Sequence, residues 1–211
     1  ERDYPSTSLL DEITEQTGKK VVCIAETEKF AHVTYFFRES KIKKNDLISS
    51  ILVPSIKAKS YENSPEMSAK KITETVINLI SSEDAIFYLI NYANPDMVGH
   101  SANMPSTIAA CEALDIELKN LYLEIVEKRN GTLFVTSDHG NAEELLTGSV
   151  AKTSHTQNPV PFLILTKKEP ATSALDPEKI TFGLSNVAST ILEQMKLKTP
   201  CKMEGNIIFI H

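Results

Sequence analysis

The sequence predicts an α/β protein with a mostly parallel central sheet flanked by helices. Short apolar runs rich in β-branched residues alternate along the chain with longer segments of helical periodicity, and this alternation is typical of parallel sheets. Three polar motifs rich in histidine and aspartate each adjoin one of the apolar runs. Sites in such proteins are built where strands end in loops, so the motifs indicate a functional site at one edge of the sheet.

The expected elements alternate from one end of the chain to the other. We predict helices at 5–17, from 65 onward, at 105–128 and at 185–195, and strands at 21–25, 51–54, 84–92, 132–136 and 160–166. Residues 32–37 fit either a helical turn or a strand, and 38–46 and 167–180 are expected to be surface segments. No repeat or domain linker interrupts this pattern, which predicts a single domain over residues 1–211.

Three of these elements carry detailed expectations. Ser64 is expected to cap the helix that starts near residue 65, with Pro65 in its first turn. The nearly continuous apolar run 84–92 is typical of a central strand that is covered on both faces. The helix 105–128 is expected to bury a stripe formed by Ile108, Leu114, Leu118, Leu121 and Ile125.

Composition narrows the class of protein and of partner. With 211 residues, 41% hydrophobic and 24% charged, the chain is a typical globular protein with a substantial core. A net charge of −6 argues against nucleic acid as the main partner but allows a small phosphorylated substrate. No apolar run approaches the ~20 residues that cross a bilayer, so no membrane partner is expected. The three cysteines are odd in number and form no Cys-x-x-Cys pair, which indicates a reducing compartment and a cytoplasmic location.

The first motif, Asn-Pro-Asp-Met-Val-Gly-His, follows the run 84–92 directly. Its Asp96 and His100 are four residues apart, and this spacing places both side chains on one side of a helical turn, where they could share a metal ion. A helix-capping aspartate with an unrelated surface histidine remains an alternative. Pro95 and Gly99 favour the metal site because they mark an irregular segment after a buried strand.

The second and third motifs add further candidate ligands. Asp138 and His139 follow the strand at 132–136, and Gly140 behind them would let the strand break so that both side chains reach one centre. A simple turn, with Asp138 bonded to its own backbone, is the alternative. His155 lies just before the last strand and would be structural if it stood alone.

The mixed nitrogen and oxygen ligands of these motifs suit manganese, zinc, cobalt or iron better than calcium. The set is nevertheless short of anionic ligands, because two divalent ions carry more positive charge than Asp96 and Asp138 balance. No serine near the motifs lies on a nucleophile turn such as Gly-x-Ser-x-Gly. Lys29, at the end of the first strand, could bind a phosphate, whereas His32 fits a core residue or an outer neighbour of the site better than a ligand.

The motifs and their surroundings resemble the cofactor-independent phosphoglycerate mutases of the alkaline phosphatase superfamily. Ala-Glu-Thr-Glu-Lys-Phe, Pro-Glu-Met-Ser-Ala and Ser-Asp-His-Gly-Asn-Ala-Glu are specific examples, and the likeness runs in order through nearly the whole chain. It extends over 25–37, 57–69, 91–100, 137–143, 155–161 and 183–188.

The resemblance implies a role for each candidate residue. It implies interconversion of 3-phosphoglycerate and 2-phosphoglycerate, in glycolysis and gluconeogenesis, through a phosphoserine intermediate and with two manganese ions, or magnesium or cobalt in their place. Asp96, His100 and His155 would bind one ion, Asp138 and His139 the second, and Lys29 the substrate phosphate. The second ion also takes an aspartate and the nucleophilic serine from an N-terminal segment in this family.

That N-terminal segment and the family's inserted transferase domain are not found in these 211 residues. The resemblance therefore implies the C-terminal part of a phosphatase domain, with no catalytic nucleophile, no mutase activity on its own and reduced or no metal occupancy. The full-length enzyme would be monomeric, while this part could self-associate through apolar sheet edges. Two alternatives remain: a metal-dependent phosphomonoesterase or sulfatase-like hydrolase of the same superfamily, and a non-catalytic metal-binding domain.

Overall fold

The computed structural model describes residues 7–38, 44–82, 85–167 and 182–201, together with 203, 205, 207 and 208. The strands are β1 (Lys20–Glu26), β2 (Ile48–Val53), β3 (Ala85–Asn91), β4 (Leu133–Thr136), β5 (Leu146–Thr147), β6 (Val150–Ala151) and β7 (Phe162–Leu165). The helices are α1 (Leu9–Thr17), α2 (Phe30–Val33), α3 (Tyr35–Arg38), α4 (Ala69–Ser82), α5 (Asn94–Gly99), α6 (Met104–Leu121) and α7 (Ser185–Gln194), with single turns η1 (Thr27–Lys29) and η2 (Tyr61–Asn63) and a π-helical extension of α6, η3 (Tyr122–Lys128).

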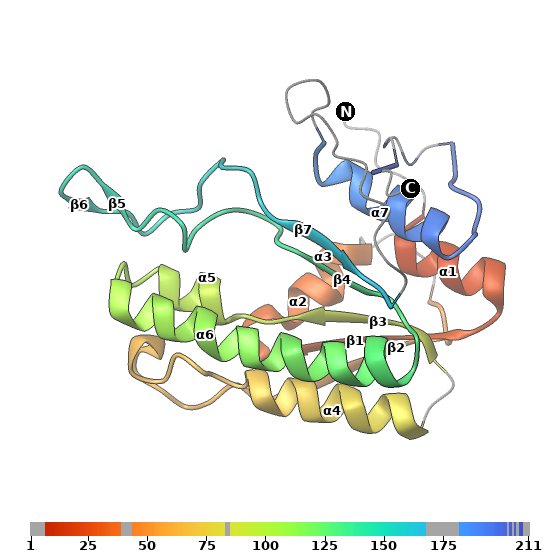
Figure 1. Ribbon diagram of the computed structural model, residues 1–211, viewed down its shortest axis with the longest axis horizontal. Helices are drawn as coiled ribbons and strands as arrows, with labels where there is room; N and C mark the ends of the chain where they lie inside the picture. The colour runs from red at the N-terminus through yellow and green to blue at the C-terminus, as the bar shows by residue number, and fades with distance from the viewer. Residues whose placement is uncertain are drawn as a thin grey trace.

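A three-stranded parallel sheet in the order β2-β1-β3 lies between two helical layers (Figure 1). Successive side chains of β1 point to opposite faces. Val21, Cys23 and Ala25 pack toward α1, α2 and α7, whereas Val22 and Ile24 pack toward α4 and α6. The expected α/β architecture with a parallel sheet between helices is therefore confirmed.

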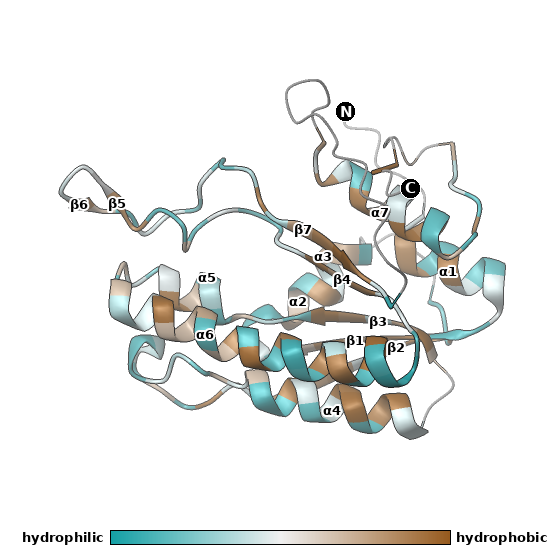
Figure 2. Ribbon diagram, in the orientation of Figure 1, coloured by the Kyte–Doolittle hydropathy of each residue, from teal (hydrophilic) through white to brown (hydrophobic). Residues whose placement is uncertain are grey.

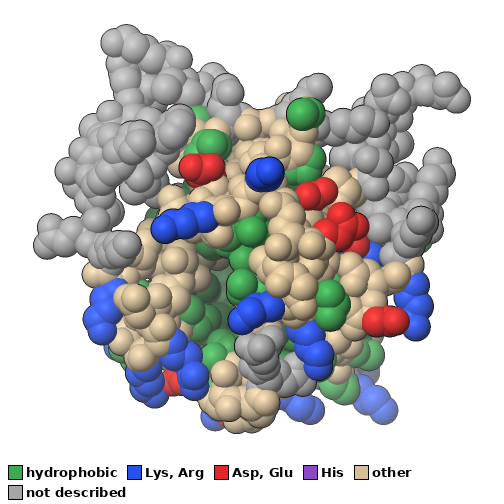
Figure 3. Space-filling model, turned by 90° about the vertical axis from the view of Figure 1, so that its right-hand side faces the viewer, with side chains coloured by type: hydrophobic (Ala, Val, Ile, Leu, Met, Phe, Trp, Pro, Cys, Tyr) green, Lys and Arg blue, Asp and Glu red, His purple; other side chains and the backbone are tan. Residues whose placement is uncertain are grey.

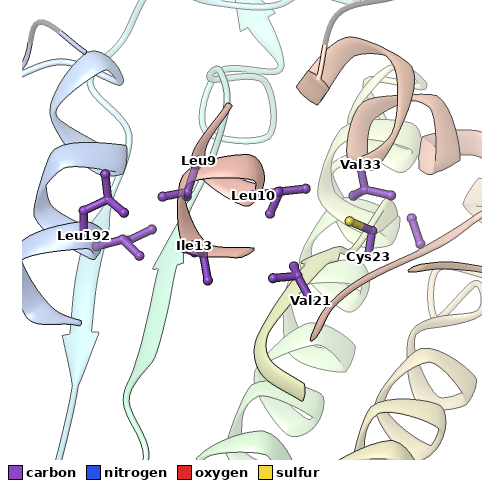
Figure 4. Close-up of a cluster of buried hydrophobic side chains, with 9 residues drawn as sticks. Leu9, Leu10, Ile13, Val21, Cys23, Val33 and Leu192 are labelled. Carbon is purple, nitrogen blue, oxygen red and sulfur yellow. The ribbon is translucent and has the colours of Figure 1, made fainter. Parts of the chain in front are cut away.

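The core on the first of these faces is a compact apolar cluster. Figure 4 shows Leu9, Leu10 and Ile13 of α1 lying between the β1 side chains and Leu192 of α7. Ser8 caps α1 by accepting a hydrogen bond from the backbone N–H of Asp11 at 3.2 Å. The hydropathy colouring shows the same division, with apolar strands inside and polar outward faces on the helices (Figure 2).

The helix expected from residue 65 begins at Ala69 instead, so the prediction of Ser64 and Pro65 as its start is wrong. Met67 has a φ of 42°, in the left-handed region, and this conformation breaks helical geometry ahead of Ala69. The turn is tied to the strand ends instead, because the Ser68 hydroxyl donates to the carbonyl of Pro54 at 2.9 Å.

Two further expectations on burial need correction. Strand β3 was expected to be central, but among the described strands it pairs only with β1, and Ile86 is 41% exposed. Ile108 was expected in the buried stripe of the long helix but is half exposed. The small side chains of Thr107 and Ala110 occupy the buried face in its place, since α5 packs closely against this end of α6.

Strands β4 and β7 form a separate antiparallel pair, and β5 and β6 form a hairpin that projects from the body of the molecule (Figure 1). Although β3 and β4 are not hydrogen-bonded to one another, they contribute to the same cores. Phe87 and Phe134 pack on one face and Tyr88 and Val135 on the other. None of the described helices combines the length and apolar character that crossing a membrane requires.

Candidate metal centre

The carboxyl ends of β1, β3 and β4 all point toward the end of the molecule that carries α5 (Figure 1). Lys29 follows β1, Asp96 follows β3, and Asp138 follows β4. Figure 3 shows the opposite end, where apolar side chains lie exposed among lysine and arginine side chains and no histidine is visible among the described residues. The histidine-rich motifs therefore gather at one end of the sheet, where sites of open α/β sheets are built.

Helix α5 brings the first two candidate ligands together. Asp96 lies in its first turn and His100 at its C-cap, so that the two side chains are one helical turn apart, as predicted. The distance between Asp96 Oδ1 and His100 Nε2 is 3.2 Å. Gly99, between them, cannot be replaced by a larger residue without conflict, because a Cβ there would lie 2.6 Å from Oδ1 of Asn141.

His155 completes a cluster of three potential ligand atoms. Its Nε2 lies 3.2 Å from the same Asp96 oxygen and 3.3 Å from His100 Nε2. The three ligand atoms are all within 4.8 Å of one another. Asp96 and His155 are far apart in sequence, and the fold brings their side chains together.

The hydrogen-bond partner of His100 fixes which ring nitrogen faces this cluster. Its Nδ1 donates to the carbonyl oxygen of Thr153 at 2.7 Å, and a carbonyl can only accept. Nε2 is therefore the ring nitrogen that faces Asp96 Oδ1, and in the neutral ring it offers the lone pair that a metal ligand needs. Such an arrangement fits a shared cation, and histidine ligands of metals are commonly oriented by a second hydrogen bond of this kind.

The Asp96 carboxylate is held in its ionised form by its neighbours. The ammonium of Lys29 donates to Oδ2, and the Asn141 amide donates to Oδ1 at 2.8 Å. Burial acts to raise the pKa of Asp96, but the hydrogen bonds from Lys29 and Asn141 and the positive charge of Lys29 outweigh it and lower the pKa. Asp96 is therefore a carboxylate over the range in which a divalent ion would bind.

Asp138 and His139 lie beside this cluster in a looser arrangement. Their closest ligand atoms, Oδ1 and Nε2, are 3.4 Å apart, and the side chain of Asp138 is 55% exposed. The His139 ring stacks on the ring of His155, with centroids 3.5 Å apart and planes inclined by 15°. The two motifs therefore meet, but within the described ranges only Asp96, His100 and His155 group as a three-residue metal cluster.

The remaining residues raised by the sequence have other surroundings. His32 is half buried and packs on Phe36, with centroids 5.3 Å apart. Burial, followed by the charge of Lys29, lowers the pKa of His32, which agrees with an outer neighbour of the site. The hydroxyl groups of Ser101 and Ser137 each donate to a nearby backbone carbonyl at 2.6 Å, so neither is presented as a nucleophile.

The contacts of Asn141, Thr153 and Glu143 were not foreseen from the sequence. Asn141 and Glu143 lie in the second motif, which the sequence had singled out. Their hydrogen-bond partners Asp96, Thr156 and Asn158 belong to other segments and could not be read from that motif. Thr153 acts through its backbone carbonyl, for which side-chain identity gives no signal.

Known proteins share the sequence and the fold of this chain. A model of the metalloenzyme superfamily matches residues 2–199. The chain is 41% identical over 199 residues to the 2,3-bisphosphoglycerate-independent phosphoglycerate mutase of Gracilaria tenuistipitata var. liui, covering 94% of this chain and 38% of that protein. It is 40% identical to the enzyme of that name from Clostridium novyi, covering 96% of this chain and 39% of that protein.

A solved structure of Leishmania mexicana phosphoglycerate mutase, at low cobalt concentration, superimposes with a TM-score of 0.82 at 30% identity. The match covers 95% of this chain and 39% of that one, so the chain spans about two fifths of the length of these relatives. A fold shared over almost the whole chain and a converging set of potential metal ligands lead to one conclusion: this chain belongs to the metalloenzyme superfamily.

Proposed function

We propose that these residues form the C-terminal part of the phosphatase domain of a phosphoglycerate mutase that interconverts 3-phosphoglycerate and 2-phosphoglycerate. The convergence of Asp96, His100 and His155 on one point carries the proposal. The substrate is inferred from the relatives, which are named phosphoglycerate mutases. One oxygen and two nitrogen ligands suit manganese or cobalt, and manganese is the proposed metal, with magnesium or cobalt as alternatives.

In this proposal the cluster formed by Asp96, His100 and His155 holds one of two ions, and Asp138 and His139 hold part of the second. Bound divalent ions would stabilise negative charge on the phosphoryl group during its transfer. The nucleophilic serine and the remaining ligands would come from outside these 211 residues, and the phosphoryl group would pass through a phosphoserine.

Lys29 is the proposed contact for the substrate phosphate. Its ammonium is held in a fixed position by Asp96 Oδ2, and its side chain is only 9% exposed. A lysine constrained in this way beside a metal cluster presents a point charge to a phosphate oxygen. Its remaining N–H groups are available for that purpose because the ammonium carries three donors.

The open edges of β3 and β4 support the proposal that part of the domain lies outside this sequence. Both strands contribute to the same two cores, yet no described strand is hydrogen-bonded between them. A strand from another part of the enzyme would fit there. Exposed edges of this kind also favour pairing between chains, so we expect self-association of the isolated 211 residues, measurable by light scattering, and a monomeric full-length enzyme.

A cytoplasmic location is part of the same proposal. Cys111 and Cys201 are exposed free thiols, which persist in a reducing compartment.

The test is a chimera in which these 211 residues replace the matching part of the Gracilaria enzyme. We expect the chimera to convert 3-phosphoglycerate to 2-phosphoglycerate in the presence of Mn²⁺, and the 211-residue chain alone to show no turnover. Asp96→Ala in the chimera should abolish conversion, because the cluster loses the oxygen that both imidazoles face.

Other results would contradict the proposal. A folded chimera that hydrolyses a simple phosphate monoester without isomerising phosphoglycerate would identify a phosphomonoesterase. A folded chimera without either activity would leave a non-catalytic domain. Turnover by the isolated chain would show that the nucleophile lies within it.

A further inference from the structure

A set of polar side chains next to the candidate ligands touches all three motifs. The carboxylate of Glu143 accepts hydrogen bonds from the backbone N–H of Asn141 at 2.7 Å, from the amide of Asn158 at 3.0 Å and from the hydroxyl of Thr156. Asn141 in turn donates to Asp96 Oδ1 at 2.8 Å. One connected path therefore runs from the segment after His155, through the segment after His139, to the carboxylate of Asp96.

We infer that Asn141 and Glu143, with Thr156, act as a positioning brace that holds the three metal-binding motifs in their relative positions. The brace residues do not bind the metal themselves, but they set the metal affinity of the cluster formed by Asp96, His100 and His155. The inference rests on the proposed function, because it assumes that Asp96, His100 and His155 bind a divalent ion. It assigns roles to residues whose partners lie far away in the sequence.

The packing around the brace shows that its geometry is tightly defined. Asn141 is 4% exposed, and Gly140 is paired with Thr156 through a hydrogen bond from the Thr156 N–H to the Gly140 carbonyl at 2.9 Å. A Cβ at position 140 would overlap the Thr156 hydroxyl and the Glu143 carboxylate. Glycine is therefore required there for close approach, and the second and third motifs are in close van der Waals contact at this point.

The brace acts on the ligands through two different links. Asn141 holds Asp96 Oδ1, the oxygen that lies 3.2 Å from both imidazoles, and so fixes the direction of that oxygen. Thr156 is the neighbour of His155 in the chain, so a displaced Thr156 moves the imidazole. Outer partners of metal ligands typically change affinity by about 10–100-fold when they are removed.

The ionised state of Glu143 agrees with this role. Burial acts to raise its pKa, but the hydrogen bonds from Thr156, Asn158 and the backbone of Asn141 outweigh it and lower the pKa to about 2. The carboxylate therefore accepts all of these hydrogen bonds throughout the neutral range.

The experiment measures Mn²⁺ binding by the 211-residue chain, using the electron paramagnetic resonance signal of free Mn²⁺, beside thermal unfolding of the same samples without metal. We expect Asn141→Ala and Glu143→Gln to weaken binding at the tighter site by about 10–100-fold. Thr156→Val should weaken it similarly, whereas Thr156→Ser keeps the hydroxyl and should bind within about threefold of the original chain.

Asn45→Ala is the matched control for stability. Asn45 makes a comparable set of side-chain hydrogen bonds near α1, including 2.8 Å to the Thr14 hydroxyl, away from the candidate ligands. We expect this variant to lower the unfolding temperature without changing Mn²⁺ affinity. The brace variants should change affinity by more than their unfolding temperatures account for.

The possible outcomes separate the brace from the metal site. If the original chain binds Mn²⁺ and Asn141→Ala and Glu143→Gln bind it equally well, the brace inference is overturned and the metal site stands. The brace inference is also overturned if Asn45→Ala and the brace variants all lose Mn²⁺ affinity in proportion to their loss of stability. If the original chain binds no Mn²⁺ at millimolar concentration, the same variants are compared in the chimera; if the chimera binds none either, the proposed site falls, and the inference falls with it.

Discussion

The two candidate metal positions differ in how many ligands the described residues provide and in how firmly these ligands are held. Around Asp96, two imidazoles and a carboxylate face one another with every ligand atom within 4.8 Å, and Asp96 and His100 are each held by a further hydrogen bond. Beside it, Asp138 and His139 offer one carboxylate and one imidazole, and the carboxylate is largely exposed. The difference teaches that ligands are preorganised where the elements that carry them pack together, and less constrained where they lie in a loop beside an unpaired strand edge.

The reason for the difference lies in the supporting contacts. Asp96 lies on a helix that packs against α6, and its two oxygens are bound by Lys29 and Asn141. Asp138 lies in a loop after the short strand β4, whose second edge meets no described strand. Preorganised ligands bind more tightly because less ordering remains to be done on binding.

The largest effect is expected from removing the charge of the carboxylate at the first position. Asp96→Asn leaves the shape of the side chain but removes the anionic ligand. We expect Mn²⁺ affinity of the 211-residue chain to fall by more than the roughly 10–100-fold that outer partners contribute. Calorimetric titration measures this, with circular dichroism to confirm the fold. Retained affinity would show that the first position is not the tighter site.

The next effect should come from the contact that joins the two positions. Gly140→Ala introduces a Cβ that overlaps Thr156 and Glu143, and overpacking of this kind costs about 1–3 kcal/mol of stability. We expect both a lower unfolding temperature and weaker Mn²⁺ binding, because the second and third motifs are pushed apart.

Gly148→Ala is the control for this change. Gly148 lies between β5 and β6 with a φ of 63° and no neighbour within 4 Å of an added Cβ. It should lose about 1 kcal/mol of stability through backbone strain and keep its Mn²⁺ affinity. Equal loss of affinity in both variants would mean that metal binding follows global stability and not the contact between the motifs.

The sequence was informative where chemistry and spacing are local. The one-turn separation of Asp96 and His100 follows from the period of a single helical turn, and the structure reproduces it. The strand expected at 21–25 follows from one apolar run and is found as β1. The convergence of His155 on Asp96 was expected from the placement of both motifs beside strand ends and from the family resemblance, but its geometry depends on the fold.

The errors arose where tertiary packing decides. Ile108 has the apolar character of a buried residue, but close contact between α5 and α6 selects the small residues Thr107 and Ala110 for the buried face. Ser64 and Pro65 form a good start signal for a helix, yet the anchored turn at Met67 and Ser68 delays that start to Ala69. The role of Asn141 likewise depends on a partner 45 residues away.

A smaller effect on metal binding, but a large one on phosphate, is expected for Lys29→Met. The ammonium competes with a metal for the charge of Asp96, so its removal should leave Mn²⁺ affinity unchanged or higher. Hydrogen bonds to charged groups contribute about 1.5–3 kcal/mol, so 3-phosphoglycerate should bind the Mn²⁺-loaded chimera about 10–100-fold more weakly. Inhibition kinetics of the chimera measure this. Unchanged phosphate binding would remove Lys29 from the proposed substrate contacts.

The smallest effect is expected from Asp138→Asn in the 211-residue chain, and it distinguishes the two positions most directly. Asp138 is largely exposed and contributes no ligand atom to the cluster around Asp96. Its removal should therefore change the affinity of the tighter Mn²⁺ site by less than about threefold, within the range of a screened surface charge. In the chimera, where the proposed second position is complete, the same substitution should lower Mn²⁺ stoichiometry from two to one. A large loss of affinity in the isolated chain would mean that Asp138 already shares a metal with Asp96, and that the two positions form one site.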